Sequence, residues 1–201
     1  MKKIIALLLV LSSIFAFSAC NLIGGPDQGS TDGSATIADY NTAISATTPA
    51  SANISVTFDN ASPAVTLEGE YIVVYNVDGT ATVSYSYDKL NQIGAADEPV
   101  TKITGIVEIG VDGSLSGSLD STVAAAAAKK FNLDESKMVY SISMGTLDAT
   151  VKANNTESVF GVAIPSDVHL IMRMSSDGKI GSFSLNYSDA KGASSIVCIY
   201  E

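Results

Sequence analysis

Four turn sequences, each flanked by alternating apolar and polar residues, most constrain the fold of this 201-residue chain. The first turn, at 77–79, reads Val-Asp-Gly, and a three-residue loop with a left-handed glycine fits it. That loop places three pairs on one face of a hairpin: Tyr75/Ala81, Val73/Val83 and Tyr71/Tyr85. Alternation with a period of two is typical of a strand with one buried face, so the segment is predicted to be a β-hairpin.

The other three turns give similar predictions. The second Val-Asp-Gly turn, at 111–113, places Ile109 opposite Leu115. In the third hairpin, a turn at 145–146 with glycine first predicts the pairs Met144/Leu147, Ile142/Ala149 and Tyr140/Val151. In the fourth, a two-residue loop at 177–178 predicts the buried pairs Met172/Phe183, Leu170/Leu185 and Val168/Tyr187, with His169 beside Asn186 on the polar face.

The remaining segments complete a mainly β (α+β) fold. Ile54, Val56 and Phe58 alternate with polar residues, and a last strand is expected over 194–200. A short N-terminal helix is predicted from residue 37 to the Thr-Thr-Pro at 47–49, and an alanine-rich helix near 121–131. We therefore expect a curved antiparallel meander sheet of about nine or ten strands with two helices.

The start of the chain has the features of an export signal. Lys2 and Lys3 precede an apolar run over 4–17, which ends in Phe17-Ser18-Ala19-Cys20. The run is too short for a stable membrane span, since fourteen residues at 1.5 Å each cover about 21 Å of a hydrocarbon core of roughly 30 Å. These residues resemble the lipobox signal peptide of bacterial lipoproteins, although the family usually has leucine where Phe17 stands. The resemblance implies cleavage before Cys20, a diacylglycerol on this cysteine with palmitate as an expected acyl chain, and an extracytoplasmic protein held at the cell envelope.

This reading divides the chain into three parts. Residues 1–19 are the predicted signal peptide, and residues 20–35 are the lipidated cysteine with a Gly/Ser/Asp-rich tether. Residues 36–201 form one predicted β-rich domain. The membrane to which the lipid attaches, the outer face of the cytoplasmic membrane or an outer membrane, is left open by the sequence.

Charge excludes some partners. The chain has a net charge of -10, which becomes -12 when Lys2 and Lys3 leave with the signal peptide. Arg173 is the single arginine. An acidic chain with one guanidinium is not expected to bind nucleic acid.

No residue pattern predicts a catalytic, cofactor or metal site. His169 is the only histidine, and the carboxylates are scattered. Ser176 and Lys179 have a spacing found in some acylating enzymes, but the Asp-Gly between them predicts a turn rather than a helix. Cys198 lies in an apolar stretch and is predicted to be a buried core residue. The chain is therefore expected not to be an enzyme, and a hydrolase is the weaker alternative.

The tyrosines suggest a binding role. Tyrosine combines apolar area with a polar tip, so the face formed by Tyr71, Val73, Tyr75, Val83 and Tyr85 is either core or the lining of a cavity for a hydrophobic ligand. A sheet meander with a helix inserted late also resembles lipoprotein carriers of the half-barrel type, which hold acyl chains. The alternative is a structural or surface-interaction lipoprotein with a protein partner, for which a solid core and an exposed apolar strip are expected.

Overall fold

The structure, a computed structural model, describes residues 35–61, 64–91, 101–189 and 192–201. All described residues belong to one compact unit, residues 32–201, which contains the sheet and its core. The predicted signal peptide and Cys20 lie outside the described residues.

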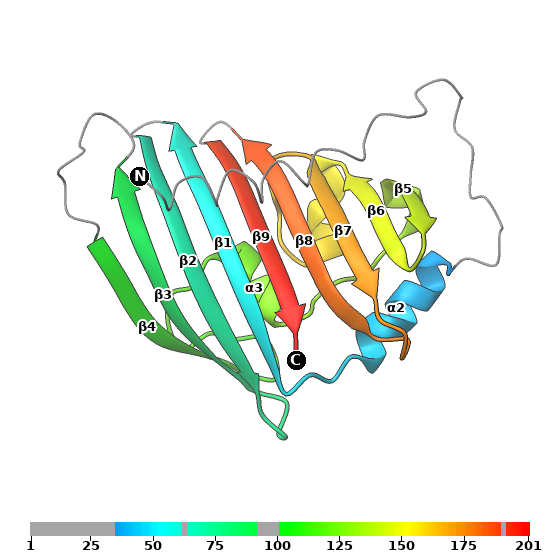
Figure 1. The fold of residues 1–201 in the computed structure, drawn as a ribbon, viewed down its shortest axis with the longest axis horizontal. Coiled ribbons are helices and arrows are strands. Elements are labelled where there is room, and N and C mark those ends of the chain that lie inside the picture. Colours follow the sequence, from blue (N-terminus) through cyan, green and yellow to red (C-terminus); the bar gives the residue numbers. More distant parts are fainter. Residues whose placement is uncertain (1–34, 62–63, 92–100, 190–191) are drawn as a thin grey trace, which may run out of the picture. The chain divides into compact units, whose positions relative to one another are not determined.

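A single antiparallel sheet of nine strands dominates this unit, which confirms the predicted fold class (Figure 1). The strand order is β4-β3-β2-β1-β9-β8-β7-β6-β5. The strands are β1 (Ser51–Ala61), β2 (Ala64–Tyr75), β3 (Ala81–Asn91), β4 (Thr101–Ile109), β5 (Met138–Ser143), β6 (Thr146–Val151), β7 (Val168–Met174), β8 (Ile180–Asp189) and β9 (Gly192–Tyr200). The sheet is open, so β4 and β5 are its edges.

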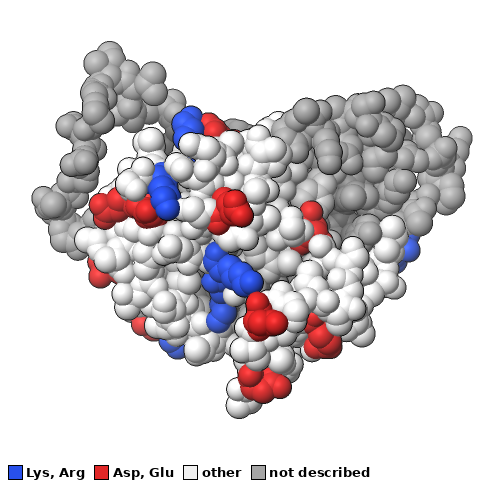
Figure 2. Space-filling model, turned by 180° about the vertical axis from the view of Figure 1, so that it is seen from behind, with Lys and Arg blue, Asp and Glu red and all other residues white. Residues whose placement is uncertain are grey.

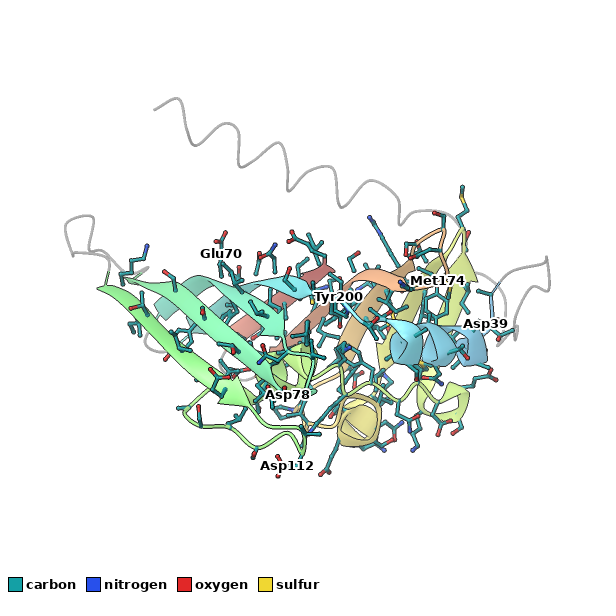
Figure 3. The ribbon with its side chains drawn as sticks, turned by 90° about the horizontal axis from the view of Figure 1, so that it is seen from below. Asp39, Glu70, Asp78, Asp112, Met174 and Tyr200 are labelled. Carbon is teal, nitrogen blue, oxygen red and sulfur yellow. The ribbon has the colours of Figure 1, made fainter. Side chains whose placement is uncertain are left out.

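The helices lie on one face of the sheet, as the view along it shows (Figure 3). They are α2 (Ile37–Ala46), α3 (Ser121–Ala127), α4 (Thr156–Phe160) and the 3-10 turns η1 (Glu135–Lys137) and η2 (Ala153–Asn155). Glu70 lies on the opposite face, which these helices leave uncovered. Seen from the helix side, Lys and Arg side chains are scattered among Asp and Glu on a mostly uncharged surface (Figure 2).

Helix α2 begins with a capping box, in which Thr36 and Asp39 satisfy each other's backbone N–H groups. Its buried side chains, Ile37, Tyr40 and Ile44, recur at the spacing that predicted the helix. Because an amphipathic helix gains most of its stability from packing, this stripe explains why α2 lies against the sheet.

The core between helices and sheet is solid near the aromatic cluster of Phe131, Phe160 and Phe183. The ring of Phe131 makes edge-on contacts with both other rings, at centroid distances of 5.9 and 4.7 Å. The gap beside this cluster, next to Ile44 and Tyr200, has no room for a water molecule.

The first hairpin has the predicted register, including the pairs Tyr71/Tyr85 and Val73/Val83. The second turn is also confirmed in that Ile109 bridges Leu115, but only as an isolated bridge rather than a pair of long strands. The register predicted for the third hairpin was wrong, because Ile142 pairs with Leu147 rather than with Ala149. Met144 and Gly145 both take positive φ, 49° and 72°, so the glycine occupies the second turn position.

In the fourth hairpin every predicted pair is present, but the predicted two-residue loop was wrong. Ser175 and Lys179 close a three-residue loop, with the Ser175 N–H donating to the Lys179 carbonyl oxygen at 2.8 Å. A β-bulge after Arg173 leaves Gly181 outside the pairing and restores the register.

Helix α3 is shorter than the predicted 121–131. Asp120 caps its start as expected, accepting hydrogen bonds from the N–H groups of Thr122 and Val123. The helix ends at Ala127 because Lys129 takes a left-handed conformation with φ 53°.

Candidate ligand cleft

A cleft of about 610 Å³ lies where two turns, the loop before β1 and the end of α3 meet. It is lined by residues 48–50, 75–77, 79–81, 109–111, 113 and 127–130. Small-molecule sites usually have volumes of about 300–1,000 Å³ and mainly apolar walls with a few polar groups. This cleft has that size, and its lining is largely Ala, Val, Ile, Pro and Gly.

The two turns of the cleft are the two Val-Asp-Gly sequences, and they adopt the same conformation. Gly79 and Gly113 have φ values of 86° and 85°, which glycine adopts at little cost. Asp78 accepts hydrogen bonds from the Thr80 hydroxyl at 2.7 Å and the Thr80 N–H at 3.0 Å. These bonds favour the ionised carboxylate and so lower the pKa of Asp78. Asp112 bonds the Ser114 N–H in the same way.

The shared conformation presents two apolar side chains at the cleft. Val77 is fully exposed and Val111 is 74% exposed. The turns also contact each other, because a Cβ atom at Gly79 would lie 3.7 Å from Val111 Cγ2. The neighbouring acidic residues of the turns, Asp78 and Asp112, lie on the helix side of the sheet (Figure 3).

Lys129 gives the cleft a partly buried cation. Its ammonium donates a hydrogen bond to the Thr47 carbonyl oxygen at 2.8 Å and lies 5.0 Å from the centre of the Tyr75 ring. The Tyr75 hydroxyl donates in turn to the Ala127 carbonyl oxygen at 2.8 Å. Burial lowers the pKa of Lys129 and raises that of Tyr75.

Of the five residues predicted to line a cavity, the structure places Tyr75 in this cleft. Val73 and Val83 are fully buried between the sheet and the elements above it, and Tyr71 is almost fully buried. The rings of Tyr71 and Tyr85 are tilted against each other at a centroid distance of 5.7 Å. A cavity lined by these four residues stays a prediction.

Val77, Val111 and Lys129 line the cleft but were not predicted as binding residues. The repeated Val-Asp-Gly turn and the lysine after the alanine run were visible signals. The sequence did not show that these segments meet, because the four segments that form the cleft are separated along the chain and come together only in the folded structure.

Groups with catalytic potential lie apart from the cleft. His169 is beside Asn186 on the uncovered face, as predicted, and its Nε2 lies 2.9 Å from the Asp148 carboxylate. Cys198 is fully buried, as predicted, and burial raises its pKa to about 12. Within the described ranges, no group of three or more His, Cys, Asp or Glu side chains could hold a metal ion.

The uncovered face of the sheet carries an apolar strip. Its members are about 40–70% exposed and lie on β2, β4 and β9: Ile72, Val74, Ile106, Val197 and Ile199. Polar residues separate them across the strands, as Asn53 does between Ile72 and Ile199. The surface-interaction alternative expects an exposed apolar strip, and these exposed residues bear on it although polar residues divide them.

The fold and the cleft thus define a mainly β protein with an open antiparallel sheet and a ligand-sized cleft at the end of α3. No protein-family model and no curated protein sequence matches the chain. Among solved structures, LprF from Mycobacterium bovis matches with a TM-score of 0.40 and 12% sequence identity, over 81% of this chain and 89% of LprF. This similarity is too low to assign a shared fold or function. In the part of the chain that the structure describes, no helix combines the length and apolar character needed to span a bilayer.

Proposed function

We propose that the protein is a non-enzymatic, lipid-anchored binding protein of the bacterial cell envelope that holds a small apolar or amphiphilic molecule in the cleft. One observation carries the binding role: a cleft of about 610 Å³ with largely apolar walls, two exposed valines and a partly buried lysine. Isolated apolar surface of this kind is stabilised when a ligand removes it from water.

The anchor is supported by the residues before Cys20. A basic start, an apolar segment and a small-small-cysteine end occur together in the order that lipoprotein processing requires. Acyl chains contribute about 0.8 kcal/mol per buried methylene, so several chains on one cysteine hold an acidic domain at a membrane without a spanning helix.

Native mass spectrometry of the full chain, extracted from the membranes of bacteria that express it, tests both parts. The expected species begins at Cys20, carries diacylglycerol and an amide-linked acyl chain, and releases a small molecule on collisional activation. A mature chain without lipid would contradict the anchor. A lipidated chain that retains no ligand, and binds none when single-chain lipids are added, would contradict the binding role.

Two tryptophan variants localise the ligand to the cleft. Ala50→Trp introduces a large side chain at an exposed lining position and is expected to abolish retention. Ala193→Trp, which adds the same side chain at an exposed position of β9 outside the cleft, serves as the control and is expected to retain the ligand. Equal retention by both variants would place the ligand elsewhere.

The exposed apolar strip on β2, β4 and β9 favours a second candidate, a surface-interaction lipoprotein that binds a protein partner. The same spectra distinguish it, because a protein complex or a dimer would then be observed in place of a small released ligand.

A further inference from the structure

The backbone at Lys129 has a conformation that usually requires glycine. The Lys129 N–H donates to the Ala126 carbonyl oxygen and the Lys130 N–H to that of Ala125, which is the Schellman arrangement at a helix end. Its left-handed position is occupied here by Lys129, with φ 53°. The left-handed backbone conformation is less favourable for a residue with a Cβ atom than for glycine. An unfavourable backbone conformation of this kind is a basis for inferring a role of the side chain.

The Lys129 ammonium has no anionic partner in the described part of the chain, where no carboxylate oxygen lies within 4.0 Å of it. Lys137, Lys152 and Lys179 each pair with an aspartate. Lys130 also lines the cleft, but it is exposed, whereas Lys129 is partly buried. The chain has 21 acidic and 11 basic residues, so carboxylates are abundant on its surface. Lys129 is thus a partly buried cation that lines the cleft and is held only by a carbonyl oxygen and a tyrosine ring.

We propose that Lys129 is the residue that recognises an anionic group of the ligand, and that the cleft takes a single-chain amphiphile with a carboxylate or phosphate head. The head binds the Lys129 ammonium, which has hydrogen-bond donors beyond the one used by Thr47. The chain packs along the apolar walls towards Val77 and Val111. A charge-assisted bond at a partly desolvated site is stronger than the same bond in water. This inference rests on the proposed binding role and specifies its ligand class.

The test uses the full chain, processed to its mature form. Binding of decanoate, decyl phosphate and decanol is measured by isothermal titration calorimetry, since the three probes share one chain and differ in head charge. Both anions are expected to bind more tightly than decanol. The tighter of the two anions identifies a carboxylate or a phosphate as the preferred head.

Substitutions at Lys129 separate charge from packing. Lys129→Met keeps most of the stem and is expected to weaken the binding of both anions about tenfold, because their ion pair with the ammonium is lost. The binding of decanol, which makes no ion pair, is expected to change little. Lys129→Arg is expected to keep anion binding. Lys129→Gly is expected to lose anion binding as the Met variant does but to melt at a higher temperature than that variant, because both lack the Thr47 hydrogen bond and glycine suits the left-handed position. Lys152→Met removes a lysine outside the cleft and is expected to leave the affinities for the anions and for decanol unchanged.

The possible failures are distinguishable. If the wild type binds none of the probes, the binding role itself fails. If decanol binds but Lys129→Met leaves anion affinity unchanged, or weakens all three probes equally, Lys129 is only a structural residue and this inference is overturned. An equal loss with Lys152→Met would assign the effect to general electrostatics and would overturn it too.

Discussion

Tyr85 on β3 covers Gly105, its direct partner on β4. A Cβ atom at Gly105 would overlap the Tyr85 ring and hydroxyl, so the glycine provides the space in which the ring lies. Glycine is unfavourable in a strand because it loses more backbone freedom on folding than other residues. An aromatic side chain packed over it offsets this cost by covering the exposed backbone.

Gly105→Ala is therefore expected to destabilise the protein although alanine is the better strand residue. The new methyl group forces the Tyr85 ring out of its position, and overpacking of this kind lowers the free energy of unfolding by about 1–3 kcal/mol. Urea unfolding followed by circular dichroism measures the change.

The control is the same substitution in a Tyr85→Ala background, where the space above residue 105 is free. There the cost should vanish or become a gain of about 0.5–1 kcal/mol, the normal preference for alanine over glycine in a strand. An equal loss in both backgrounds would show that the ring is not the cause.

Among the elements, the end of α2 is linked to the start of β8 by one buried hydroxyl. Thr47 Oγ1 donates to the Ala43 carbonyl oxygen at 2.6 Å and accepts from the Ile180 N–H at 2.9 Å. Only 3% of Thr47 is exposed. The threonine thus ends the helix and satisfies the first backbone donor of β8 at the same time.

Thr47→Val keeps the shape of the side chain but leaves the Ile180 N–H buried without an acceptor. The expected loss is about 1–3 kcal/mol in the free energy of unfolding, with faster hydrogen exchange at the Ile180 amide. Thr42→Val is a matched control, because the Thr42 hydroxyl makes the same bond within the helix, to the Ala38 carbonyl oxygen, but is exposed. Its effect should stay within about 0.5 kcal/mol. Equal effects of the two variants would contradict a linking role for Thr47.

The elements also show how far local sequence determines this fold. The Val-Asp-Gly hairpin was predictable in register because its turn and its strand alternation agree. The hairpin at Gly145 was not, since Met144 takes a left-handed conformation that methionine rarely adopts. Ile142 nevertheless stays on its predicted face, because the error in register was two residues.

The cleft was less predictable than the strands. Its chemistry depends on Lys129, whose direction is set by the end of α3 and by Thr47, 82 residues away along the chain. Periodicity predicts which face of an element is buried, but not which loops meet at its end. Tyr75 was predicted as a possible cavity residue from the face that it shares with other apolar residues of the first hairpin. Its place in the cleft comes from its position as the last residue of β2.

At the scale of the whole molecule, ionisable groups on the helix side of the central strands link stability to alkaline pH. Tyr75, Tyr200 and Cys198 lie on the helix side of β2 and β9, and burial raises the pKa of all three, that of Cys198 to about 12. In the unfolded chain a cysteine titrates at about 8.5 and a tyrosine at about 10. The folded state therefore holds these protons more tightly than the unfolded state does.

The sign of the pH dependence follows from this difference. Stability from these groups is fully present below about pH 8.5 and is lost as the pH rises towards the folded pKa values, by about 1.4 kcal/mol per pH unit and group. Urea midpoints measured from pH 7 to 11.5 are expected to be level to about pH 8.5 and then to fall with increasing slope. Cys198→Ala should delay the fall to about pH 10, because the remaining groups are phenols. Tyr200→Phe should leave its onset unchanged and make the slope above pH 10 shallower. Midpoints that stay level up to pH 11.5, or variants that follow the wild-type curve, would show that these groups have the same pKa in the folded and unfolded states. Either result would contradict the burial of these groups in the folded protein.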